Sequence, residues 1–129
     1  MNMLRDQLRA RHAYASVASV PTRQRDDYRI AVNSFGAHVI RTGLCAAIAW
    51  LQRDDRDASG LFLKHLDAAE IRGLVSPPGG TKASSFADKV HAAEAANYMV
   101  ATRDTLALVV WFRRAVQALK SDDRQDGAR

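Results

Sequence analysis

Apolar residues recur along the chain at intervals of three and four, which is the spacing of one face of an α-helix. Alanine, leucine and arginine, which all favour helices, are abundant throughout. Almost no stretch shows the period-two alternation of a half-buried strand. The pattern therefore predicts an all-α fold, a bundle of about five to six helices.

The first half of the chain is predicted to form four helices. Their expected spans are about 2–19, 23–33, 35–53 and 60–73. Pro21 separates the first two, and Gly73 is placed to end the fourth. The stripe expected to face the core on the first helix consists of Leu4, Leu8, Ala15 and Ala18. On the third helix the corresponding stripe consists of Ile40, Gly43, Leu44, Ala47, Ile48 and Leu51.

The segment "SPPGGTKASS", residues 76–85, combines prolines, glycines and small polar residues, and it predicts a surface loop. The two helices expected after it span about 85–98 and 102–120. Thr102 is expected to be the N-cap of the last helix, with Asp104 in its first turn. The residues expected to face the core on this helix are Leu108, Trp111, Phe112, Ala115 and Leu119. The polar residues 121–129 are expected to form a flexible tail.

The length of 129 residues, with 47% hydrophobic and 26% charged residues, is typical of one globular domain spanning 1–129. The single cysteine, Cys45, allows no internal disulfide, which is usual in the reducing cytosol. The longest apolar runs, "LCAAIAWL" and "LALVVWF", are too short to cross a bilayer. The charged start "MNMLRDQLRARH" lacks the apolar core of a signal peptide. A soluble cytoplasmic protein without a membrane partner is therefore expected.

The net charge of +5 favours an acidic partner, which could be nucleic acid, a membrane surface or an acidic protein. Arginine supplies 15 of the 19 basic residues, and its planar guanidinium fork suits phosphate groups and base stacking. A GC-rich genome would also enrich a chain in alanine and arginine. That would explain the choice of arginine over lysine, but it would not explain the positive net charge.

No group of residues has the spacing of a catalytic or metal-binding site. The segment "PPGGTK" lacks the spacing of a phosphate-binding loop and follows no apolar strand. His91 and Glu94 could share one face of a helix, but the chain has only two glutamates to complete a carboxylate site. Cys45 lies on an apolar helix, where a buried, inert thiol is the expected state. The sequence therefore predicts no enzyme, no metal and no cofactor.

The last predicted helix carries basic residues on one side. With about 100° per residue, one arc of about 120° contains Arg103, Arg113, Arg114, Gln117 and Lys120. No acidic residue between Asp104 and Asp122 balances these cations. A second basic cluster, diluted by two neighbouring aspartates, consists of Arg23, Arg25 and Arg29. Such faces are either ordinary solvated surface or contacts for phosphates, which would be independent of base sequence and sensitive to salt.

Three stretches resemble the small subunit of the type III-B CRISPR effector, the Cmr complex. They are "RARHAYASV" (9–17), "IRTGLCAAIAWL" (40–51) and "YMVATRDTLALVVWFRRAVQAL" (98–119). The order and separation of the stretches and the length of the chain also agree with that family. The chain departs from it in "SFGAHVIRTGL", where the family often has a proline and a polar residue, and residues 54–97 contain nothing diagnostic.

The resemblance implies a non-catalytic subunit that stacks in several copies as a minor filament beside a groove for guide and target RNA. The implied partners are the other Cmr subunits, including the large backbone subunit, further copies of the chain, CRISPR RNA and target single-stranded RNA. Carried over from the family, the residues for RNA or filament contact are Arg113, Arg114 and Arg41. Charge geometry adds Arg103, Lys120, Arg23 and Arg25. The positions matched to structural roles are Gly43, Leu44, Trp111 and Tyr98.

Three other interpretations remain open at this stage. The related helical small subunit of the type III-A complex belongs to the same class. A basic helical adaptor that binds an acidic protein without nucleic acid belongs to a different class. A helix-turn-helix DNA-binding protein would need a recognition helix after a tight turn, and the sequence shows no convincing turn of that kind.

Overall fold

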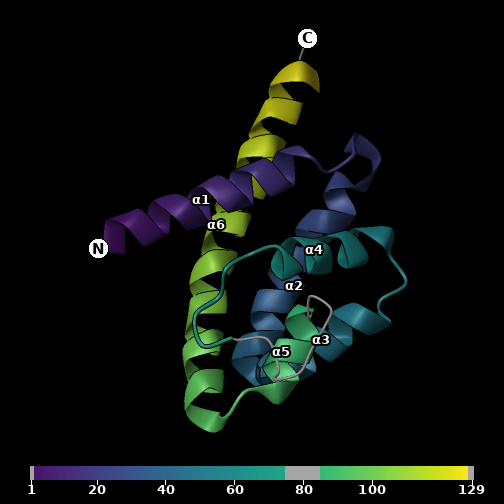
Figure 1. Ribbon diagram of the computed structural model, residues 1–129. Helices are drawn as coiled ribbons and strands as arrows, with labels where there is room; N and C mark the ends of the chain where they lie inside the picture. The colour runs from purple at the N-terminus through teal and green to yellow at the C-terminus, as the bar shows by residue number, and fades with distance from the viewer. Residues whose placement is uncertain (1, 75–84, 128–129) are drawn as a thin grey trace.

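The computed structural model describes the backbone of residues 2–74 and 85–127, and the side chains of 4–74 and 85–119. Within these residues it contains helices and no strands, which confirms the all-α prediction. The helices are α1 (Asn2–Ala18), η1 (Thr22–Gln24), α2 (Arg25–Thr42), α3 (Leu44–Arg53), α4 (Asp57–Asp67), α5 (Phe86–Ala92) and α6 (Ala95–Gly127). Figure 1 shows the long helix α6 along one side of the molecule. The helix α1 crosses α6, and the helices α2 to α5 lie together on the opposite side of the molecule.

Aromatic rings from three helices form the centre of the core. Phe62 of α4 packs edge-to-face against Tyr28 and Phe35 of α2, with ring centroids 5.6 and 5.5 Å apart, and against Phe112 of α6 at 5.2 Å. All four side chains are fully buried. Edge-to-face pairs add to the large apolar area that each ring buries. This cluster therefore fixes α2, α4 and α6 relative to one another.

The helix α1 faces the core with a different side from the predicted one. Leu4 is 63% exposed, and Leu8, Ala15 and Ala18 are exposed as well. The side chains that it buries are instead Ala13, Ser16 and Val17, followed by Val20 beyond the end of the helix. Small side chains let α1 cross α6 at close range, whereas leucines would hold the helices apart. Periodicity identified the helix, but two of its sides carry apolar residues at helical spacing.

The break between α2 and α3 lies at Gly43. The sequence pattern had predicted it near residue 34. Gly43 has φ +93° and ψ 168°, a conformation that is practically restricted to glycine. Leu44, the next residue, is fully buried, as expected. Ile40 was expected in the core but is 75% exposed. Ile40 belongs to α2, which continues to Thr42, and not to the same helix as Leu44, Ala47 and Ile48. Its side chain therefore need not point to the same side as theirs.

The last helix begins earlier than predicted. Since α6 starts at Ala95, Thr102 is not an N-cap, and its hydroxyl donates to the carbonyl of Tyr98 within the helix. Asp104 likewise lies in the helix interior rather than in the first turn. The backbone of α6 remains helical to Gly127, and the flexibility predicted for 121–129 stays a prediction.

Two shorter helices also differ from the predicted spans. The helix α4 starts three residues earlier and ends at Asp67. The helix α5 ends at Ala92, and a capping box between Ser85 and Asp88 fixes its start. The loop predicted for 76–85 lies, except for Ser85, outside the described residues.

Candidate nucleic-acid and protein interface

The solvent-facing side of α6 presents both arginines and aliphatic residues. At spacings of four and three residues, one stripe contains Met99, Arg103, Leu106, Val110 and Arg113, which we call the outer stripe. Met99 is 58% and Val110 42% exposed, and Leu106 is half-buried. Arg103 and Arg113 are exposed, and so is Arg114 beside the stripe. These three predicted basic residues thus share one accessible surface.

Trp111 connects the core to this surface. Its ring is half-buried against the core, and the guanidinium of Arg114 lies 4.6 Å from the ring centroid. A cation over an indole face is attracted by about 0.5–1 kcal/mol at an exposed site. The two adjacent aromatic residues therefore have different roles. Phe112 is buried in the core, and Trp111 orients an exposed cation.

The remaining predicted basic residues lie elsewhere. Arg41 is exposed near the C-terminal end of α2, whereas Arg23 is exposed in η1 and Arg25 is half-buried at the start of α2. The rise per residue in a helix places Arg41 about 24 Å from Arg25. The side chain of Lys120 lies outside the described residues. The predicted cations are thus distributed over η1, α2 and α6 and do not converge on one point.

Three of the four residues expected to have structural roles lie near the start of α6, and the fourth, Trp111, lies further along this helix. The Tyr98 hydroxyl accepts a hydrogen bond from the backbone N–H of Cys45, 3.0 Å away. This bond satisfies one of the free N–H groups in the first turn of α3. A Cβ placed on Gly43 would lie 3.4 Å from the same hydroxyl. Gly43, Leu44 and Tyr98 therefore form one junction between two stretches that are distant in the sequence.

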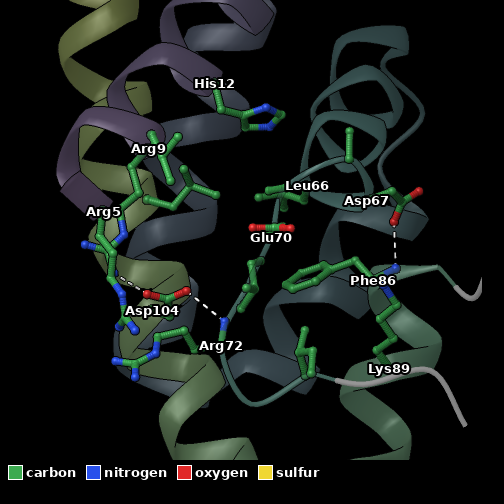
Figure 2. A pocket seen from close by; sticks show the side chains of 16 residues that line it. Arg5, Arg9, His12, Leu66, Asp67, Glu70, Arg72, Phe86, Lys89 and Asp104 are labelled. Atoms are coloured by element: carbon green, nitrogen blue, oxygen red, sulfur yellow. Dashed lines mark hydrogen bonds and ion pairs between the residues drawn. The ribbon is translucent and has the colours of Figure 1, made fainter. Parts of the chain in front are cut away.

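An ion pair that the sequence did not predict joins α1 to α6. The Arg9 guanidinium contacts the carboxylate of Asp104, which is only 8% exposed. The other oxygen of Asp104 accepts from the backbone N–H of Arg72 at 2.8 Å (Figure 2). Burial lowers the pKa of Arg9, but the hydrogen bond and charge of Asp104 outweigh it and raise the pKa overall. Both partners lie in stretches that resemble the Cmr family, although nothing in the sequence indicated their pairing.

A pocket of about 660 Å³ opens beside this ion pair, between α1, residues 66–74, α5 and α6 (Figure 2). Its rim carries both cations, such as Arg5 and Lys89, and the carboxylate of Glu70. The carboxylate of Asp67 accepts from the backbone N–H of Phe86 at 2.8 Å and so serves to position α5. Among the described side chains, those of residues 4–74 and 85–119, no group of three or more His, Cys, Asp or Glu could hold a metal ion.

A polar cluster that the sequence also did not reveal links α1, α2 and α4. The Tyr28 hydroxyl lies 2.7 Å from Nδ1 of His65, and Nε2 of His12 donates to the carbonyl of His65 at 2.8 Å. Burial, assisted by the nearby His12, lowers the pKa of His65. Burial also raises the pKa of Tyr28, so both side chains are held neutral. The cluster therefore helps to pack α1, α2 and α4 against one another.

Among the described helices, none combines the length and apolar character that a membrane-spanning segment needs. The fold and its surface are those of a small all-helical protein that presents basic, partly apolar helix faces to solvent. The family model of the CRISPR-associated protein (Cas_Cmr5) matches residues 5–119. The chain therefore belongs to the Cmr5 family, which confirms the predicted resemblance.

A solved structure supports the same family. The crystal structure of a CRISPR-associated Cmr5 family protein from Thermus thermophilus superposes with a TM-score of 0.72 and 26% sequence identity. The match covers 88% of this chain and 96% of that protein. The search among curated proteins gives no match.

Proposed function

We propose that the chain is a non-catalytic structural subunit of a type III-B CRISPR effector, the Cmr complex, and acts in cytoplasmic antiviral defence. The observation that carries this proposal is the match of residues 5–119 to the Cmr5 family, together with the shared helical fold. The hydrogen bonds and ion pair that join different helices support a structural role. Asp104, Tyr98 and His65 each connect helices to one another.

In this role the chain stacks with copies of itself in a minor filament and lines the channel for guide and target RNA. The net charge of +5 and the exposed Arg103, Arg113 and Arg114 support contact with anionic partners. Each phosphate that an arginine neutralises releases counterions, so such contacts would be strong at low salt and would need no base recognition. The other predicted residues for RNA or filament contact are Arg41, Lys120, Arg23 and Arg25.

A second candidate function is a helical adaptor that binds an acidic protein and no nucleic acid. The aliphatic residues between the arginines of the outer stripe favour it, because phosphate contacts alone do not need exposed methionine and valine. This candidate differs from the first in the absence of RNA and of other Cmr subunits among its partners.

The proposed function is tested by purifying the tagged chain from its native host at low salt and identifying co-eluting proteins and RNA together. Recovery of the other Cmr subunits with short guide RNAs is the expected result. Recovery of unrelated acidic proteins without RNA would overturn the proposal and support the adaptor.

A further inference from the structure

The outer stripe has the composition of a protein-protein interface. It combines three aliphatic residues and two arginines over about 21 Å of helix, from Met99 to Arg113. Methionine and arginine are both enriched in such interfaces, where an apolar centre is surrounded by polar residues. Three aliphatic residues in line, at least partly open to solvent, differ from the scattered single apolar residues of an ordinary surface.

The apolar surface continues from α6 onto α2. A Cβ on Gly36 of α2 would lie 3.2 Å from Val109 of α6, and Gly43 lies against Tyr98. These contacts place the C-terminal half of α2 alongside the N-terminal half of α6. Ile40, which is 75% exposed, lies on α2 between the two glycines. Because these two contacts hold α2 against α6 on either side of Ile40, we infer that its exposed side chain lies near the outer stripe.

The charge of this surface has one sign. Between Ala95 and Leu119, the only acidic residue of α6 is Asp104, and it is buried on the opposite side against Arg9. The residue after Ile40 is Arg41, which is exposed. A partner that covers this surface must therefore supply aspartate or glutamate side chains around an apolar strip, because the chain itself offers none there.

We propose that the outer stripe and Ile40 dock on an acidic, partly apolar surface of a different protein subunit of the same complex. This inference rests on the proposed function and specifies which of its basic residues face protein. Arg103 and Arg113 then pair with carboxylates of that subunit, and Met99, Val110 and Ile40 fill its apolar strip. Electrostatic complementarity of this kind speeds association and sets the register of docking.

RNA fits this surface less well than protein does. Proteins that bind single strands stack bases on exposed aromatic rings, whereas the outer stripe contains none. The nearby Trp111 is half-buried, and the guanidinium of Arg114 lies over its ring. Aliphatic side chains next to a phosphate backbone would remain unburied. The arginines of the stripe are therefore better explained by carboxylates of a protein.

A second copy of the chain is also a less favourable occupant. A second copy would have to offer an acidic patch of its own to this basic surface. The exposed acidic residues at the start of α2, Asp26 and Asp27, lie among Arg23, Arg25 and Arg29. Those at the α3–α4 junction are likewise interspersed with arginines, in the sequence "RDDRD" of residues 53–57. Neither patch provides the concentrated negative charge that the outer stripe requires.

The test is incorporation of the chain into the complex purified through a tag on another Cmr subunit. Two double variants probe the two components of the stripe: Met99→Ser with Val110→Ser, and Arg103→Glu with Arg113→Glu. Matched controls are Ile30→Ser, an exposed aliphatic residue elsewhere on α2, and Arg56→Glu, an exposed arginine in the α3–α4 connection. Circular dichroism and thermal melting confirm that every variant is folded. Incorporation is measured by quantitative mass spectrometry, with ultraviolet cross-linking to RNA in parallel.

We expect each double variant to reduce incorporation at least about tenfold, as loss of central contacts does, and each control to stay within about twofold of the wild type. Normal incorporation of either double variant would overturn the inference, whether or not cross-linking to RNA is lost. Self-association of the isolated chain that both double variants abolish would also overturn it, in favour of a second copy. Failure of the wild-type chain to join the complex would instead overturn the proposed function, and this inference with it.

Discussion

At the scale of single residues, several polar side chains that join the elements of this protein have partners that lie far away in the sequence. Asp104 binds Arg9 and the backbone of Arg72, and Tyr98 binds the backbone of Cys45. These hydrogen bonds stabilise the fold because a polar group that is removed from water and loses its partner still pays the free energy of desolvation. Such pairs form only after the helices have packed, which is why helical periodicity does not reveal them.

Replacing Asp104 should destabilise the fold. Asp104→Ala leaves the Arg9 charge and the Arg72 N–H without their carboxylate, and we expect a loss of about 2 kcal/mol, less than for a fully buried pair because Arg9 is partly exposed. Asp6→Ala is the matched control, since Asp6 pairs with the same arginine on the exposed surface and should cost under about 0.5 kcal/mol. Urea denaturation followed by circular dichroism measures both, and equal losses would contradict the assignment.

His65 should make stability depend on pH. Its pKa is lowered in the folded protein, so the unfolded chain binds the proton first as the pH falls below about 6.5. The free energy of unfolding should therefore decrease from pH 7.5 towards pH 5. In His65→Gln this part of the pH dependence should be absent. Urea titrations of both proteins across that range measure the difference, and identical slopes in the two proteins would rule out the effect.

At the scale of elements, helix boundaries depend on backbone conformation more than on apolar periodicity. The sequence predicted helices in the right number and order, but it placed a break near residue 34, where α2 is continuous, and none at Gly43. Periodicity also did not distinguish the two apolar sides of α1, because the buried side is made of small residues. The basic side of α6 was predictable, since the direction of a side chain follows from its position on the helix.

Gly43 should tolerate no side chain. Gly43→Ala forces a Cβ into a conformation available practically only to glycine, and we expect a loss of about 2–3 kcal/mol in the free energy of unfolding. Gly60→Ala is the matched control. Gly60 lies inside α4 with nothing within 4 Å of its Cβ position, so alanine should stabilise the helix by about 0.5–1 kcal/mol. Thermal and urea denaturation measure the two opposite shifts, and a neutral Gly43→Ala would contradict the requirement for glycine at this position.

At the scale of the whole molecule, one hydrophobic core holds the helices, and α6 presents one basic, partly apolar side to solvent. The fold class and the family were predictable because they depend on periodicity and on three short stretches. That Ile40 of α2 lies near the arginines of α6 was not predictable, because it depends on how α2 lies against α6. The functional proposal follows from the family, and the proposed division of contacts between protein and RNA follows from this packing.

The most direct test of the central proposal is native mass spectrometry of the complex purified through a tag on another Cmr subunit. A stacking structural subunit predicts more than one increment of 14.2 kDa from this chain in a particle that also contains guide RNA. A particle that contains guide RNA but lacks this chain, or one that holds it as a single copy bound to an acidic protein without RNA, would contradict the proposal.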